Sequence, residues 1–441
     1  MAIKHQKNLF ADLIVGPPWL KHWARAFALA SLVHLTLPDF EQSGWATPRI
    51  IEGLGALILL WRPSALGFGL CLLGTAWPLL FLRDVLTQSM LLTWMAALGV
   101  FGALCSQRAI LSGVTWITAG TYWLAALHKL NAGFFNLEIS CAQHAWHQVL
   151  DRWTWLPETQ FGQELAISIV AIEITIGVLI VKRSLWAWVI GIVFHFPLTV
   201  TLAPAFGAVM FCGFAAGLTP RQVAILRRSL ALNKVRWVGG GLVFVLVDIQ
   251  AHFETLNVAI LLKCFVFGGL FAGFLLGAIR LSDGGWNHPN RWVALYFGLW
   301  ILHGLTPYIG VQYQHTSAML SNLRIDTECH NSFVFPESLI FRDPYVRIDQ
   351  AHIGQGQRPQ REATLKSGLW SFPALATMHR NWCIEELRPI RLEGSYGERS
   401  FIIEDLCKQD WYRSLVDSDS LRGFQRFQKN LKRRCEAECV H

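Results

Sequence analysis

The chain has 441 residues, of which 53% are hydrophobic and only 15% are charged, with a mean hydropathy of +0.36. Soluble domains carry roughly 25% charged residues, so this composition excludes an ordinary soluble protein and indicates a polytopic membrane protein. The formal net charge of +8 does not require a nucleic-acid partner, because the cytoplasmic loops of membrane proteins are enriched in lysine and arginine.

Residues 1–12 are polar and contain no signal-peptide core, so we expect residues 1–21 to form a cytoplasmic N-terminal segment before the first spanning helix. From residue 22 to residue 315, apolar runs predict an all-α polytopic membrane helical bundle of about nine to eleven transmembrane or re-entrant helices. Several runs are short for a full crossing, and Pro197 and Pro204 interrupt the region 185–218. The predicted segments are 22–38, 50–61, 64–82, 89–105, 109–128, 165–181, 185–203, 205–218, 237–250, 257–279 and 292–308.

The basic residues between these segments predict an orientation. With a cytoplasmic N-terminus, the inner segments carry 15 lysines and arginines and the outer segments carry 4. Cytoplasmic loops hold the excess of basic residues in membrane proteins. We therefore expect a cytoplasmic N-terminus and an extracytoplasmic C-terminus.

Lys129 follows an apolar stretch, 109–128, that is long enough to cross a bilayer. A charged amine near membrane depth is costly, so burial would favour the neutral amine, which can act as a base. The alternative is a lysine that extends from the helix end to the lipid headgroups.

The next segment, 141–161, is aromatic and amphipathic, which predicts a helix lying in the outer membrane interface. Cys141, His144 and His147 recur on successive helical turns and are weak candidates for metal ligands, because no fourth ligand is positioned. Cys435 and Cys439 with the terminal histidine form a second incomplete set. Disulfides, helix capping and simple polar contacts are the alternatives at both places.

Two ionisable residues, Glu173 and His195, lie inside later apolar segments. Such residues usually face the interior of a bundle or a cavity. One interpretation is a hydrogen-bonded pair that locks two helices together. The other is a cavity that opens outward, in which Lys129 and His195 are catalytic and Glu173 contributes to substrate binding.

Residues 316–441 have an ordinary polar composition and predict a small extracytoplasmic β-rich domain. Alternation predicts a strand over 345–349, and the segments 390–393 and 400–404, joined through 394–397, predict a hairpin. A terminal basic helix is expected around Leu421 to Leu431, either packed on this domain or touching the membrane surface.

The ten cysteines fall into two groups, one within the predicted spans and one outside them. Four lie in predicted spans, where they are most simply apolar packing residues: Cys71, Cys105, Cys212 and Cys264. Six fall on the predicted oxidising side, where at least one disulfide is expected although the pairing cannot be deduced: Cys141, Cys329, Cys383, Cys407, Cys435 and Cys439.

The stretch from Tyr122 to Phe134, Tyr-Trp-Leu-Ala-Ala-Leu-His-Lys-Leu-Asn-Ala-Gly-Phe, resembles the signature helix of the HTTM family, the horizontally transferred transmembrane domain of vitamin K-dependent γ-carboxylases. The segment at 194–195, leading to 206–211, and the passage 306–324 resemble two further parts of that family in the same order. The resemblance covers roughly residues 20–330.

The resemblance implies that Lys129 is the base that deprotonates a reduced, vitamin K-type hydroquinone, with oxygen as co-substrate, and that His195 lines the same pocket. Tyr122, His128 and Asn131, in the same motif, are predicted to bind the substrate. Residues 316–441 are far fewer than carboxylases use to hold protein substrates, so we expect a carboxylase- or epoxidase-like lyase or oxidoreductase acting on a hydrophobic small molecule in a bacterial inner membrane. The alternative is a non-catalytic membrane protein, a transporter or an assembly partner, in which Lys129 and His195 are structural.

Overall fold

A computed structural model of the chain divides it into two compact units, one of residues 1–126 and 142–301 and one of residues 127–141 and 302–441. The first unit is helical, and the second carries a small β-sheet. The structure describes residues 16–36, 46–81, 87–105, 107–157, 159, 161–203, 205–251, 258–280, 284–311, 316–317, 320–326, 328–340, 345–353, 359–371, 375, 390–396, 399–406, 431–436 and 439.

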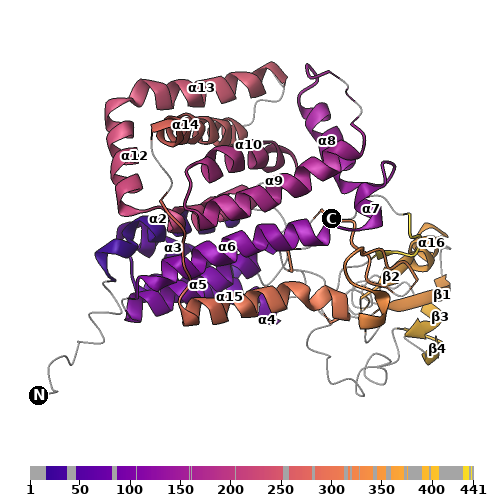
Figure 1. Ribbon diagram of the computed structural model, residues 1–441. Coiled ribbons are helices and arrows are strands. Elements are labelled where there is room, and N and C mark those ends of the chain that lie inside the picture. The colour runs from indigo at the N-terminus through magenta and orange to yellow at the C-terminus, as the bar shows by residue number, and fades with distance from the viewer. Residues whose placement is uncertain are drawn as a thin grey trace, which may run out of the picture. The chain divides into compact units, whose positions relative to one another are not determined.

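Helices account for nearly all of the described part of the first unit (Figure 1). In chain order they are η1 (Pro18–Leu20), α2 (Lys21–His34), α3 (Ala46–Trp61), α4 (Ala65–Phe81), α5 (Thr87–Cys105), α6 (Ala109–His128), α8 (Cys141–Arg152), α9 (Gln163–Val181), α10 (Trp186–Thr201), α11 (Phe206–Gly217), α12 (Pro220–Leu232), α13 (Lys234–Ala251), α14 (Val258–Arg280) and α15 (Arg291–Leu305). Helices α6, α8 and α15 continue into the second unit at one end.

Each of the eleven apolar segments predicted from the sequence falls on one of these helices. Within the described residues, however, only five helices are long and apolar enough to cross a membrane, namely α5, α6, α9, α14 and α15. The break expected between 185 and 218 lies between α10 and α11, and Pro197 is accommodated inside α10. Helices α11 and α12 together would make a sixth crossing, but they meet at a bend of 117° and form a broken span or a re-entrant loop.

The residues at the start of α12 explain the bend after α11, and two glycines explain the close packing of α13 on α14. Thr219 and Gln222 form a reciprocal capping box at the start of α12, and Pro220 occupies the first helical position, so a new helix begins there. Helices α13 and α14 lie alongside each other (Figure 1). Gly240 and Gly268 allow this close packing, because a Cβ on either residue would collide with the backbone of the other.

The second unit contains a five-stranded antiparallel sheet in the order β4-β3-β1-β2-β5. Its elements are α7 (Ala132–Phe135), η4 (Thr306–Ile309), η5 (Glu337–Leu339), β1 (Val346–Ile353), α16 (Pro359–Ser367), β2 (Gly368–Trp370), β3 (Ile390–Tyr396), β4 (Arg399–Ile403) and β5 (Leu431–Lys432). Alternate residues of β1 and β3, including Ile348 and Leu392, are buried together with Leu365 of α16 and form the core of this unit.

The predicted strand and hairpin are confirmed, with one correction to the hairpin and one to the segment after it. The strand β3 continues to Tyr396 and pairs with β4 as far as Arg399, so residues 394–396, expected in the loop, belong to the strand. Gly394 is needed there, because a Cβ would collide with the carbonyl oxygen of Arg347 next to a register shift in β1. The expected terminal basic helix lies mostly outside the described residues, and Leu431, placed at its end, is in strand β5.

Two disulfides close the second unit, so the prediction of at least one is confirmed. They join Cys141 to Cys439 and Cys329 to Cys435. Cys383 and Cys407 lie outside the described residues. Of the four cysteines expected in apolar segments, Cys71, Cys212 and Cys264 are buried and Cys105 is exposed, and all four are free thiols.

Candidate functional site

The helical unit brings together Tyr122, His195 and Glu173. The Tyr122 hydroxyl and Nε2 of His195 are 2.5 Å apart, and both side chains are buried. The ring tautomer decides which of the two groups donates this hydrogen bond. Glu173 is buried on α9 and lies close enough for its carboxylate to act electrostatically on the Tyr122 hydroxyl. Three helices, α6, α9 and α10, therefore supply one polar cluster.

Aromatic rings enclose His195. The rings of Phe194, Phe206 and Phe211 lie 5.1, 5.5 and 6.0 Å from the imidazole, measured between centroids. Within the described residues, Nδ1 of His195 has no hydrogen-bond partner, and neither has the Oγ1 of Thr199, which lies one helical turn further along α10. Buried polar atoms are almost always paired, so two such atoms on one helix face mark a place where a bound molecule could supply the partner. Thr199 was not predicted from the sequence.

Lys129 belongs to the second unit and is buried, with only 5% of its surface exposed. Its Nζ lies 5.8 Å from the ring centroid of Phe134, within the range of a cation–π contact. A lysine that extended to the headgroups would expose its amine at the surface of the protein. The burial of Lys129 therefore argues against that interpretation.

His128 precedes Lys129, and its two ring nitrogens are both engaged. Nε2 lies 2.9 Å from the carbonyl oxygen of Thr316, which can only accept, so Nε2 carries the proton. Nδ1 then accepts from the hydroxyl of Tyr308 at 3.0 Å, and the two rings stack. A neutral histidine with both nitrogens satisfied has no free group for a substrate. His128 therefore links the last residue of α6 to Tyr308 and to the backbone of Thr316.

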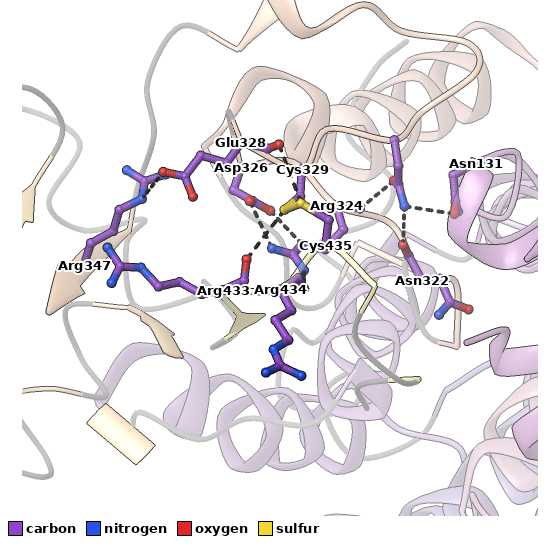
Figure 2. Close-up of polar contacts among 11 residues, drawn as sticks. Asn131, Asn322, Arg324, Asp326, Glu328, Cys329, Arg347, Arg433, Arg434 and Cys435 are labelled. Atoms are coloured by element: carbon purple, nitrogen blue, oxygen red, sulfur yellow. Dashed lines mark hydrogen bonds and ion pairs between the residues drawn. A yellow bond between two sulfur atoms is a disulfide. The ribbon is translucent and has the colours of Figure 1, made fainter. Parts of the chain in front are cut away.

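Asn131 has an equally complete set of partners, and its place beside Asn322 is seen in Figure 2. Its side-chain oxygen accepts from the backbone N–H of Phe134 and so caps α7, and it also accepts from the amide of Asn331 at 3.3 Å. Its amide donates to the carbonyl oxygens of His128 and Ser321. These bonds explain the asparagine two residues after Lys129, because the Asn131 side chain fixes the turn in which Lys129 lies.

The hydrogen-bond network continues from Asn131 through Asn331 and Asn322 to an ion pair. The amide of Asn331 donates to the carbonyl oxygen of Asn322 at 2.8 Å, and its side-chain oxygen accepts from the backbone N–H of Arg324. Arg324 makes a bidentate pair with the fully buried Asp326 at 2.7 and 3.0 Å, and also donates to the carbonyl oxygen of Arg434 (Figure 2). This chain of contacts ties the segment after α6 to the C-terminal region.

The metal interpretations are not supported by this arrangement. The sulfur of Cys141 is bonded to Cys439, so it is not a thiolate ligand. His144 is partly buried and His147 is exposed on α8. In the part of the chain that the structure describes, no group of three or more histidines, cysteines or acidic residues is placed to hold a metal ion. The cysteines 435 and 439 are likewise both in disulfides.

An apolar groove of about 720 Å³ lies among α5, α6 and α15. Its walls include Phe101, Ile110, Val293 and Tyr296, and none of the predicted site residues lines it.

Another polar group was not predicted from the sequence: His34, Glu52 and Ser89 form a buried hydrogen-bonded chain in the helical unit. The criterion applied to Glu173 and His195, an ionisable residue within an apolar segment, also selects His34 and Glu52. Comparison of this chain with models of known protein families, with curated proteins and with solved structures finds no significant match in any of the three.

Proposed function

We propose that this chain is an integral membrane protein of the HTTM type that acts on a lipid-soluble substrate, with Lys129 as the catalytic base. Five apolar helices of spanning length and the low content of charged residues support membrane insertion. The motif around Lys129 supports the family. In this proposal the membrane is a bacterial inner membrane, with the N-terminus cytoplasmic and the C-terminal unit periplasmic.

The burial of Lys129 is the observation that carries the catalytic proposal. Only 5% of its surface is exposed, so the side chain is shielded from bulk water. Lysines that serve as general bases in proteins are typically buried, and in this proposal the lone pair of Nζ accepts the proton. A hydroquinone is a suitable substrate class, because it is lipid-soluble and carries an acidic O–H. The base step is one proton transfer from that O–H to Nζ, which leaves a hydroquinone anion and an ammonium.

His195 and Tyr122 have a positioning role in this proposal. The hydrogen bond between them fixes the imidazole ring, and Nδ1 is left to bond a polar atom of the substrate. The surrounding phenylalanines suit an aromatic or isoprenoid body. His195→Ala should therefore reduce activity less than loss of the base does.

The test compares three lysine variants in nanodiscs with a hydroquinone-consumption assay. Lys129→Met should abolish activity, because it removes the basic nitrogen while keeping an unbranched chain. Lys129→Arg should also be inactive, because a guanidinium does not lose its proton. Lys182→Met is the matched control: Lys182 also lies over an aromatic ring, that of Trp286, but is not placed in the site. A fully active Lys129→Arg protein would exclude the role of Lys129 as a base.

One observation favours the non-catalytic alternative. The two neighbours of Lys129 in the motif, His128 and Asn131, are used entirely for internal hydrogen bonds. In the alternative Lys129 belongs to the same structural network. Lys129→Met would then lower the thermal stability of the purified protein, whereas a catalytic lysine that is costly to bury would leave the stability unchanged or raise it. The unfolding midpoint of the two proteins in one detergent distinguishes these outcomes.

A further inference from the structure

Three side chains from different helices form a buried line of hydrogen bonds in the helical unit. Nδ1 of His34, on α2, lies 3.2 Å from both carboxylate oxygens of Glu52, on α3. Nε2 of the same ring lies 2.9 Å from the hydroxyl of Ser89, on α5. All three side chains are almost fully buried. None of them belongs to the proposed site around Lys129.

The order of these groups is that of an acid–histidine–serine triad. A carboxylate can only accept, so it selects the tautomer with the proton on Nδ1. Nε2 then carries a lone pair directed at the serine, and the serine hydroxyl donates to it. In such an arrangement the histidine is the general base, the serine is the nucleophile, and the carboxylate orients the ring and stabilises the imidazolium. We propose that Ser89 is the nucleophile of a second, acyl-transfer site in this membrane protein.

Neighbouring contacts hold the three groups in place. The thiol of Cys71 donates to the backbone carbonyl oxygen of Glu52 at 3.6 Å, and a Cβ at Gly74 would collide with Glu52, so α4 fits closely against α3. The hydroxyl of Thr93 donates to the backbone carbonyl oxygen of Ser89 at 2.7 Å. These contacts fix the backbone positions from which Glu52 and Ser89 reach the ring of His34.

Acyl transfer also needs hydrogen-bond donors for the oxyanion, and the position of Ser89 places it beside such donors. Helix α5 begins at Thr87, so Ser89 lies in its first turn. Backbone N–H groups in the first turn of a helix have no partner within the helix, and they favour negative charge. They are suited to stabilise the oxyanion that forms when the serine hydroxyl adds to a carbonyl group.

The substrate class follows from the surroundings. The helices α2 to α5, which carry the three residues and pack beside them, are apolar along most of their length. In this proposal the substrate is an ester of a hydrophobic acid. The Ser89 oxygen bonds to the ester carbonyl carbon while its proton moves to Nε2 of His34. The bond from that carbon to the leaving alcohol then breaks, and the alcohol takes the proton. Water, activated by His34 in the same way, releases the acid and restores the serine.

An alkyl fluorophosphonate tests this proposal, because it reacts with an activated serine by losing fluoride and forming a phosphonyl ester. The full-length protein in nanodiscs should be labelled on Ser89, as determined by mass spectrometry of its peptides, and heat-denatured protein should not. Absence of label in the folded wild-type protein, or label only on another residue, would overturn the proposal. This measurement needs no variant and is independent of the fate of Lys129.

Three variants then test the roles. His34→Gln should slow labelling by about 10²- to 10⁴-fold, the usual contribution of a general base. Glu52→Gln should slow it as well, because an amide no longer imposes the required tautomer. Ser112→Ala is the matched control, since Ser112 is a buried serine that donates to Asn287 at 2.8 Å and lies outside the triad. The folding of each variant is checked by comparing its elution volume with that of the wild-type protein. Equal labelling rates in wild type and His34→Gln would show that the three residues are only a structural network.

Discussion

The disulfide between Cys329 and Cys435 should contribute strongly to the stability of the sheet-containing unit. The relevant change is the double substitution Cys329→Ala and Cys435→Ala, which removes the bridge without leaving an unpaired thiol. Arg433, two residues before Cys435, bonds its backbone N–H to the carbonyl oxygen of Ser367, and its guanidinium pairs with Asp349 of β1 at 2.6 Å. Loss of the bridge should therefore loosen the edge of the sheet as well as the C-terminal segment.

The size of the effect follows from the length of chain that the bridge closes. The two cysteines are 106 residues apart. The loop-entropy relation gives about 4.7 kcal/mol for a loop of this length, and measured values for disulfides are typically about 2–4 kcal/mol. For the bridge between Cys141 and Cys439, 298 residues apart, the shortest covalent path through the other bridge is about 190 residues. Because the dependence is logarithmic, the two bridges should contribute similarly.

Hydrogen exchange of peptides from β1 and β3 is the assay, because core strands exchange through opening of the whole unit. A loss of about 2–5 kcal/mol corresponds to exchange that is faster by about 30- to 5,000-fold. Cys105→Ala, which removes an exposed free cysteine of the other unit, is the control and should leave the exchange unchanged. The wild-type protein must first be shown to contain the disulfide. If exchange in β1 and β3 is then the same with and without the bridge, the predicted stabilisation is refuted.

Two further predictions concern the helical unit and the orientation. Arg152 makes three contacts of 2.8–3.0 Å with the buried carboxylate of Asp248, so Arg152→Met should cost about 3–5 kcal/mol in unfolding free energy, and adding Asp248→Leu should restore most of it. Equal unfolding midpoints in detergent for the single and double variants would contradict this. A reporter fused after residue 225 should give a cytoplasmic signal and one fused after residue 441 an extracytoplasmic signal, because the basic residues are concentrated in the predicted inner segments. The same signal from both fusions would contradict the predicted orientation.

The positions of the helices could be predicted from the sequence because an apolar run of sufficient length has few alternatives to a helix. The number of crossings could not. Helices α2, α3 and α10 have 14, 16 and 16 residues, fewer than the number a spanning helix needs. The strands of the C-terminal unit were predictable from alternation, but the end of β3 was placed too early, since glycine and serine at 394–395 are typical of turns.

The candidate site was predictable only residue by residue. A lysine, a histidine and a glutamate in apolar segments are conspicuous, and all three are indeed buried. Their partners are not visible in the sequence, because contacts such as Tyr122 with His195 join residues 73 positions apart. His128 and Asn131 were assigned to substrate binding on a local motif, and their hydrogen bonds run to residues 180–200 positions away. Disulfide pairing was unpredictable for the same reason.

His34 and His195, both buried in the helical unit, differ in a way that suggests different uses. His34 has partners on both ring nitrogens, so its tautomer and orientation are set before anything binds. His195 has a partner on Nε2, whereas Nδ1 has none within the described residues. A buried polar atom without a partner is costly, and a ligand that supplies the partner recovers that cost on binding. A molecule with one hydrogen-bonding group and a large apolar body should therefore bind beside His195, whereas chemistry at His34 requires only access of a carbonyl group to Ser89.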